Sequence, residues 1–312
     1  MKKIYFFLSI SLLSLNGISQ QLPNFTQFEA NDLFFNPAVA GTKKLIDVRT
    51  DYRMQWLGFD GAPTTKTITL NSRFMNGKMG AGFCLYQDET GPTTRTTYLL
   101  DYAYHLKFND AELSFGLDGS MTEYFVNGGL ITIHNSMDPA INQAVTQKAW
   151  TPDAGAGLYL YNDRYHFGLS VLNLMQGTEK FTASDARLPF APHIYGSLGY
   201  NFSANPDYIF EHTLFINYVA GSPFLVDYSL RMHYKEKMFI GLCYIMKDAI
   251  SLQAGMTFKT DFQVSYSYDL VTSPLHLYNS GTHEIMLIYS TDLKKKKGTN
   301  SDFQKRKYGY LF

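Results

Sequence analysis

Long stretches of this chain alternate between apolar and polar residues, and this two-residue period constrains the fold more than any other feature. In residues 45–57 the even positions are apolar or aromatic except for Thr50, and positions 47 to 55 between them are charged or polar. Residues 93–108 and 224–235 repeat the pattern. Because successive side chains of a β-strand point to opposite faces, the pattern predicts strands with one apolar and one polar face.

The composition indicates which face is outside. A soluble β-sandwich also alternates, but its polar face would be the outer one. Only 17% of the residues are charged, against about 25% in an ordinary soluble domain, and 16% are aromatic. A soluble surface of this kind would be prone to association. A charge on the lipid face at mid-bilayer costs about 2–4 kcal/mol. We therefore predict an all-β fold, a closed antiparallel transmembrane β-barrel whose charges face the lumen.

The alternating segments number fourteen, an even number that leaves no sheet edge unpaired in lipid. We place the strands at residues 45–57, 65–74, 78–89, 93–108, 111–126, 150–162, 164–177, 191–204, 207–220, 224–235, 237–247, 249–260, 262–272 and 282–291. Tight turns such as Asn76–Gly77 follow the even-numbered strands, which is a hairpin signal. Longer connections are expected at Leu57–Thr65, Gln87–Thr93, Asn127–Ala149, Gly177–Pro189 and Thr272–Thr282. The short turns are predicted to face the periplasm and the long loops the cell exterior.

The lumen is predicted to hold charges of both signs. The alternation turns these inward: Asp47, Arg49, Asp51, Arg53, Arg73, Arg95, Asp101, Glu211, Asp227 and Arg231. Opposite signs on neighbouring strands should pair and fill the lumen rather than select an ion. Fourteen strands lie between side-chain-filled small barrels and open porins, and we favour a plugged barrel over an open pore.

The N-terminus resembles a secretory signal peptide. Lys2 and Lys3 precede an apolar stretch from Ile4 to Leu15, and small residues follow to Ser19. A transmembrane anchor is the alternative, but the stretch is shorter than the roughly 20 residues that a span needs. We divide the chain into a signal peptide (1–19), a periplasmic plug segment (20–44), an outer-membrane barrel (45–293) and a basic periplasmic tail (294–312). Both termini of the mature chain are thus expected in the periplasm.

Catalytic and metal-binding motifs are missing from the sequence. The eight His residues show no metal-ligand spacing, and neither HExxH, CxxC nor G-x-S-x-G occurs. Cys84 and Cys243 fall on distant strands and are expected to be free thiols. The zero net charge argues against nucleic-acid binding. We expect no enzyme activity, no cofactor and no metal, although spacing alone leaves a lumen-mouth hydrolase open.

Several motifs carry a family resemblance. They are Asn24–Phe28, Phe34–Gly41, Arg53–Thr65, Asp88–Pro92, Ala103–Leu106, Tyr266–Leu270 and Gly281–Ile285. Together they resemble the PorP/SprF family of type IX secretion membrane proteins of Bacteroidota, over essentially the whole mature chain. The element Asn36-Pro37-Ala38 is also similar to the start of fatty-acid-transporter-like barrels, which have fourteen strands.

The resemblance implies a non-enzymatic outer-membrane component of the type IX secretion or gliding machinery. Members are implied to work with periplasmic ring lipoproteins, or to help a secreted surface adhesin reach or stay on the cell surface. The alternative from the transport class is a channel for a hydrophobic solute.

The motif residues also have a physical interpretation. Asn36-Pro37 is typical of a turn, since proline fixes φ and lacks an N–H donor, and Gly41 ends the same motif. Part of the segment is expected to fold into the periplasmic mouth. Arg53 precedes Trp56, which we expect at the aromatic girdle, and these residues shape the first outer loop: Gly58, Gly61 and Pro63. The alternative is that all of them only build turns.

The C-terminal tail is strongly basic, with seven basic residues and one acidic. The basic residues are Lys294, Lys295, Lys296, Lys297, Lys305, Arg306 and Lys307. Since the whole chain is neutral, the barrel itself has an acidic excess. The tail is predicted to dock onto an acidic periplasmic partner, or else to be solvated. It ends in alternating aromatics, Tyr308, Tyr310 and Phe312, which offer an alternative last strand in place of 282–291.

Overall fold

The computed structural model describes residues 22–43, 46–131, 147–180, 187–220, 222–258 and 261–291. The expected signal peptide and the basic tail lie outside these residues. Within them, no helix is long and apolar enough to cross a bilayer.

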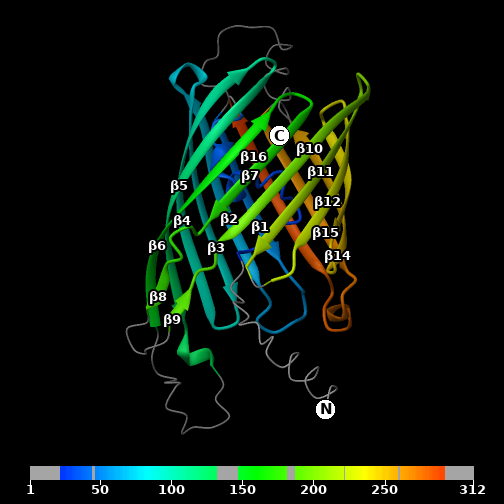
Figure 1. The fold of residues 1–312 in the computed structure, drawn as a ribbon. Coiled ribbons are helices and arrows are strands. Elements are labelled where there is room, and N and C mark those ends of the chain that lie inside the picture. Colours follow the sequence, from blue (N-terminus) through cyan, green and yellow to red (C-terminus); the bar gives the residue numbers. More distant parts are fainter. Residues whose placement is uncertain are drawn as a thin grey trace, which may run out of the picture.

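Fourteen antiparallel strands of the described chain close into a barrel (Figure 1). The strands are β1 (Ile46–Met54), β2 (Thr64–Phe74), β3 (Met79–Thr90), β4 (Thr93–Phe108), β5 (Ala111–Val126), β6 (Gln147–Tyr161), β7 (Tyr165–Leu172), β10 (His193–Asn205), β11 (Tyr208–Val219), β12 (Leu225–Tyr234), β13 (Met238–Ile245), β14 (Ala249–Phe258), β15 (Phe262–Val271) and β16 (Thr282–Thr291). Each pairs with its neighbour in the chain, and β16 closes the barrel on β1 with Ile46 opposite Thr291. The predicted number of strands and the placement of the last one at 282–291 are confirmed.

Connections differ between the two ends of the barrel. One end, which we call the short-turn end, carries tight turns such as η2 (Met75–Gly77). The long-loop end carries η3 (Gly128–Leu130), η4 (Pro274–Leu277) and a small hairpin of β8 (Thr178–Lys180) and β9 (Arg187–Pro189). This end is at the bottom of Figure 1. The long connection expected at Gln87–Thr93 is wrong, because pairing of β3 with β4 continues to Thr90 and Thr93.

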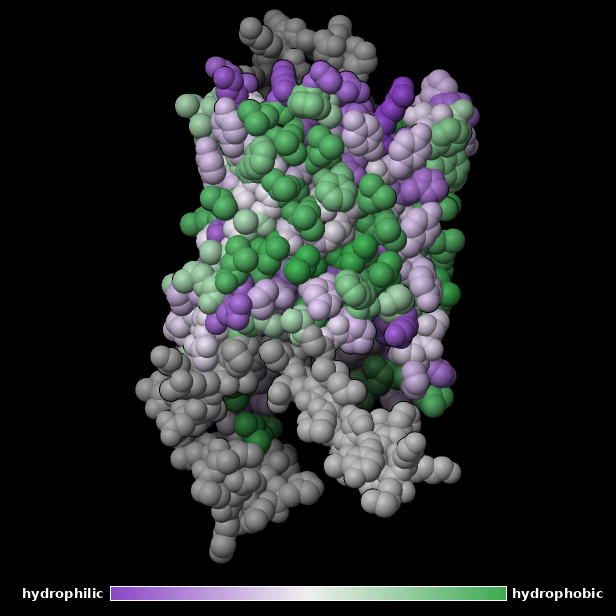
Figure 2. All heavy atoms as spheres, in the orientation of Figure 1, coloured by the Kyte–Doolittle hydropathy of each residue, from purple (hydrophilic) through white to green (hydrophobic). Residues whose placement is uncertain are grey.

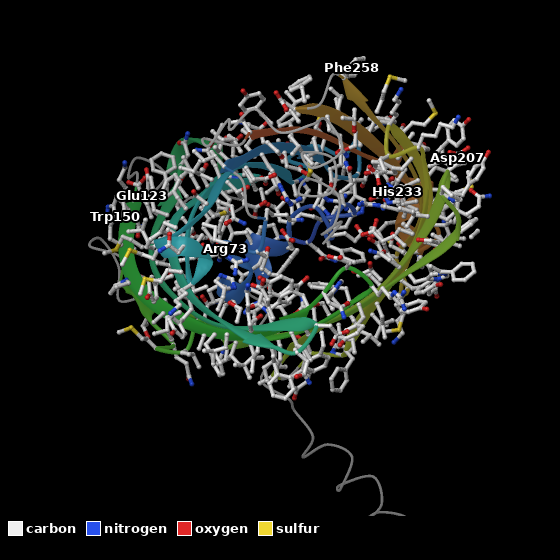
Figure 3. The ribbon with its side chains drawn as sticks, turned by 90° about the horizontal axis from the view of Figure 1, so that it is seen from above. Arg73, Glu123, Trp150, Asp207, His233 and Phe258 are labelled. Atoms are coloured by element: carbon white, nitrogen blue, oxygen red, sulfur yellow. The ribbon has the colours of Figure 1, made fainter. Side chains whose placement is uncertain are left out.

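The alternation sorts side chains between lumen and outside. In β1 the charged residues at positions 47, 49 and 53 are buried, whereas Tyr52 between them is 39% exposed. Apolar side chains gather across the middle of the visible outer face in Figure 2. Viewed along the barrel in Figure 3, Arg73 and His233 lie inside the ring, and Trp150 and Phe258 lie outside it. An apolar outside around a charged inside is the arrangement of an outer-membrane barrel.

Residues 22–43, which we call the inner segment, lie inside the barrel (blue, Figure 3). They contain the short helix α2 (Asp32–Phe35) and the turn η1 (Pro37–Val39). The Leu22 N–H donates to Nε2 of His193, the first residue of β10 at the long-loop end. The segment therefore runs along the lumen from that end to the short-turn end, where β1 begins.

This path corrects one expectation. The start of the mature chain and the short turns are both expected in the periplasm. Leu22 and the short turns lie at opposite ends of the barrel, so they cannot both face the periplasm.

Aromatic rings of the inner segment form a core within the lumen. Phe25, Phe34 and Phe35 pack edge to face, with ring centroids 4.9 to 5.9 Å apart. Phe35 also contacts Tyr195 and Phe215 of the wall, at 5.1 and 4.6 Å. The two predicted free thiols, Cys84 and Cys243, are buried in the same core and unpaired. The lumen therefore has an apolar centre as well as charged walls.

We expect Leu252→Arg to destabilise the barrel by about 2–4 kcal/mol, because it puts a charge on the lipid face in the middle of β14. Leu252 is 52% exposed on that face. The matched control is Leu277→Arg, since Leu277 is 71% exposed but lies in the loop turn η4. Urea unfolding in lipid vesicles should separate the two variants. Equal unfolding midpoints would contradict the assignment of the outer face to lipid.

Candidate functional site: the inner segment and its attachments

The turn at Asn36–Gly41 is built by its own side chains. Oδ1 of Asn36 accepts the Ala38 N–H at 2.9 Å, which caps η1, and Pro37 begins that turn with its φ already fixed. Nδ2 of Asn36 donates to the Leu158 carbonyl of β6 at 3.0 Å. Gly41 ends the turn at φ +76°, a left-handed conformation that favours glycine.

The wall behind this turn is a line of four small residues on adjacent strands. Gly80, Ala103, Gly116 and Gly157 are direct partners across β3, β4, β5 and β6. We call them the small-residue row. A Cβ on Gly116 would lie 2.1 Å from the Ala38 nitrogen, and one on Gly80 would lie 2.0 Å from the Ala40 oxygen. The row thus lets the backbone of the turn touch the backbone of the wall.

A polar cluster closes the short-turn end of this contact. Nε2 of His105 lies 2.8 Å from the Ala40 carbonyl oxygen. The Tyr161 hydroxyl donates to Glu112 at 3.0 Å, and Arg73 forms an ion pair with the same carboxylate. The turn is therefore held by hydrogen bonds as well as by close packing.

Another part of the wall, formed by β1, β15 and β16, holds the inner segment by charge. Arg53 forms ion pairs with Asp269 at 3.0 Å and Glu284 at 2.8 Å. The two Glu284 oxygens accept the consecutive backbone N–H groups of Thr26 and Gln27, at 2.8 and 2.9 Å. The Thr26 hydroxyl donates to Asp269 and accepts from Arg53. We call Arg53, Asp269, Glu284 and Thr26 the arginine cluster.

Further ion pairs tie the middle of the inner segment to the wall. Arg231 of β12 binds Glu29 at 2.7 Å. Arg49 binds Asp47 on its own strand at 2.5 Å and Asp32 of the inner segment at 3.1 Å. A buried charge is costly unless it is paired, and each of these charges has an ion-pair partner of opposite sign.

The other predicted lumen charges have varied partners. Asp51 accepts from Asn31, and Asp227 accepts from Asn24. Glu211 pairs with His233 at 2.7 Å. Asp101 does not follow the expected pairing of opposite signs, because its direct neighbour on β5 is Asp118, another carboxylate. Its buried Oδ2 has no hydrogen-bond partner within the described chain.

The remaining motif residues form the loop between β1 and β2. The residues of this loop with positive φ are Trp56, Gly58 and Gly61. Hydrogen bonds join it to the η4 loop through Leu57 and Gly281, at 2.9 Å. On the other side, the Gly91 N–H donates to the Gly61 carbonyl at 3.0 Å, and the Pro63 carbonyl accepts from Gln55. Trp56, Gly58, Gly61 and Pro63 therefore organise the long-loop end, far from the turn at Asn36–Gly41.

The chain matches the family model of the type IX secretion system membrane protein PorP/SprF over residues 17–289. The chain belongs to this family. No curated protein matches it in sequence.

Two solved barrels have a similar structure. One is a FadL homologue of Pseudomonas aeruginosa, which is 14% identical, covers 88% of this chain and 95% of its own, and has a TM-score of 0.49. The other is the toluene transporter TbuX of Ralstonia pickettii, which is 9% identical, covers 83% of this chain and 92% of its own, and has a TM-score of 0.51. At this identity, the likeness to TbuX shows the fold alone.

Several residues that hold the inner segment are not predicted from the sequence. Asp269 and Glu284 lie inside motifs that carry the family resemblance, and Glu29 and Asp32 lie in a segment without alternation. The small-residue row had a detectable signal, because Gly116 and Gly157 stand at lumen-facing positions of their strands. A glycine there indicates that another backbone approaches closely.

Gly116→Val should destabilise the PorP/SprF barrel by at least about 1–3 kcal/mol, because the new side chain overlaps the backbone of the η1 turn. Gly119→Val on the same strand is the control, since a Cβ there meets nothing within 4 Å. Urea unfolding in vesicles measures both variants. If both unfold at the wild-type midpoint, the contact of the row with the turn is not a close one.

Arg53→Gln should cost about 3–5 kcal/mol, because it leaves Asp269 and Glu284 buried without their cation. Lys66→Gln is the matched control: Lys66 also pairs with a carboxylate, that of Glu89, but both side chains are almost half exposed. Such surface pairs contribute about 0–1 kcal/mol. The same unfolding assay applies, and similar losses in the two variants would argue against the arginine cluster as a main attachment.

Proposed function

We propose that this PorP/SprF barrel is a non-enzymatic component of the type IX secretion or gliding machinery. It binds protein partners and helps to export or anchor a secreted surface adhesin. The observation that carries the proposal, beyond family membership, is the attachment of the inner segment to two separate parts of the lumen wall. A barrel filled in this way serves as a fixed scaffold, with the inner segment as its plug, rather than as an open pore.

The proposal includes an orientation in the outer membrane. A signal peptide is removed during export, the short turns face the periplasm and the long loops face outward. The basic tail follows β16 at the short-turn end, where it can reach periplasmic ring lipoproteins. The long-loop end exposes the apolar side chains of Leu277 and Tyr278, 71% and 68% exposed, in reach of an adhesin on the cell surface.

Crosslinking in the native cell tests this function. We expect the barrel to capture a secreted adhesin or ring lipoproteins, and its deletion to remove the adhesin from the cell surface. Leu277→Ser with Tyr278→Ser should reduce adhesin capture several-fold, whereas Met75→Ser should not, since Met75 is similarly exposed but lies at the short-turn end. Capture of neither class of partner by the wild-type barrel would contradict the proposal.

A second candidate is a channel for a hydrophobic solute. It is favoured by a cavity between the inner segment and the wall that is lined by Phe28, Phe35, Tyr195 and Phe215. The cavity measures about 30 Å³, room for a few water molecules, so a solute could pass only after the inner segment moved. Uptake of a labelled fatty acid that depends on the barrel would support this candidate. Equal uptake by cells with and without the barrel would exclude it.

A further inference from the structure

A second cavity, of about 100 Å³, lies at the short-turn end between the inner segment and strands β11 to β16 and β1. We call it the vestibule. Four carboxylates line it: Glu29, Asp47, Glu211 and Glu236. Its basic residues are Lys43, Arg49 and Arg231, with His233 beside them. Unlike the aromatic cavity, the vestibule is therefore a charged site.

The basic groups of the vestibule are already engaged. Arg49 binds Asp47 and Asp32, and Lys43 lies 3.4 Å from the second Asp32 oxygen. Arg231 binds Glu29 and also donates through Nε to Gln253 at 2.6 Å. Each of these basic groups thus already has a carboxylate partner.

The carboxylates, in contrast, have spare acceptor capacity. Oε2 of Glu211 forms a hydrogen bond with Nε2 of His233, but Oε1 of Glu211 is buried without a hydrogen-bond partner in the described chain. Oε1 of Glu29 is likewise buried without a hydrogen-bond partner in the described chain. Both side chains are 2% exposed. A buried carboxylate oxygen without a donor is costly, so these two oxygens favour a cationic hydrogen-bond donor in the vestibule.

The vestibule wall also suits an alkyl ammonium group. Phe239 stacks beneath the Arg231 guanidinium at 4.9 Å, and its ring lies 5.4 Å from that of His233. Gly255 makes room for this stack, because a Cβ there would lie 2.1 Å from the Phe239 ring. Because Arg231 already stacks on this ring, the wall offers a lysine apolar contact for its stem, and the carboxylates bind its charge.

Glu236 stands at the turn between β12 and β13, beside the vestibule. Partial burial raises the pKa of Glu236, and the neighbouring His233 opposes the shift. A docked cation would lower this pKa again, because an opposite charge favours the carboxylate form.

A run of four lysines follows, in the sequence, a strand that lines the vestibule. Ile288 and Ser290 of β16 line the cavity, and β16 ends at Thr291. Lys294–Lys297 follow in the sequence. Four extended residues span about 14 Å, so Lys294 is within reach of a cavity that Ser290 itself lines.

We propose that the vestibule is the docking site of the chain's own basic segment Lys294–Lys297, with a lysine ammonium bound between Glu29 and Glu211. This docking does not depend on which way the barrel faces, because β16 ends beside the vestibule in either orientation. An acidic partner of the tail must compete with the vestibule for the same lysines. The failure of this proposal would leave the proposed scaffold function intact.

Limited trypsin digestion of the full-length barrel tests the docking, because a docked lysine is protected from cleavage. At about 0.01 M salt we expect cleavage at Lys294–Lys297 to be about ten-fold slower than at Lys305–Lys307 in the same tail. Glu29→Gln with Glu211→Gln should remove this protection, and Glu89→Gln at the long-loop end should not. Equal cleavage of the two basic runs in the wild type, or protection that survives in the double variant, would overturn the proposal.

Two measurements on the wild-type protein make the test independent of how the variants fold. About 1 M salt should abolish the protection, because it screens the ammonium from the carboxylates. Carbodiimide, which joins amines to carboxylates in contact, should link Lys294–Lys297 to Glu236 or Glu211. Links that reach only carboxylates outside the vestibule would overturn the proposed site.

Discussion

The interior of this barrel depends on one backbone contact, that of the Asn36–Gly41 turn with the small-residue row. Two backbones approach this closely only where no side chain stands between them, and sheet register places Gly80, Ala103, Gly116 and Gly157 in one line. The position of the turn sets that of α2 just before it. Phe34 and Phe35 of α2 then meet the aromatic residues of the wall. A larger side chain in the row would displace the turn and the core together.

Two parts of the lumen wall hold the inner segment by different physical means. At the small-residue row the contact is short-ranged and depends on shape. At the arginine cluster it is electrostatic, and each carboxylate has several donors, which compensates for the loss of water around it. Buried charges with single partners are weak evidence for stability, but a cluster of this kind specifies position, because it leaves charges unpaired in any other register.

The sequence predicted the wall much better than the contents of the barrel. Alternation locates strands and separates Arg53 and Asp227 from the lipid face, because a charge in lipid is too costly. Alternation does not predict which groups meet inside the lumen. For example, the Glu284 carboxylate accepts the backbone N–H of Thr26, which is 258 positions away in the sequence. The pairing of Asp101 with Asp118 was missed because alternation gives the direction of a side chain and not its register. The path of the inner segment was not predictable, since its contacts come from nearly every strand.

The order of elements along the chain has a consequence for assembly. The inner segment is the part that precedes β1, and the sheet closes only when the last strand, β16, pairs with β1. The barrel wall thus surrounds the inner segment, which belongs to the same polypeptide. Once β16 has paired with β1, the inner segment cannot leave between strands and can leave only along the barrel axis, through one open end. The inner segment can therefore be enclosed from the side only before β16 pairs with β1, and after that step it can enter only along the barrel axis.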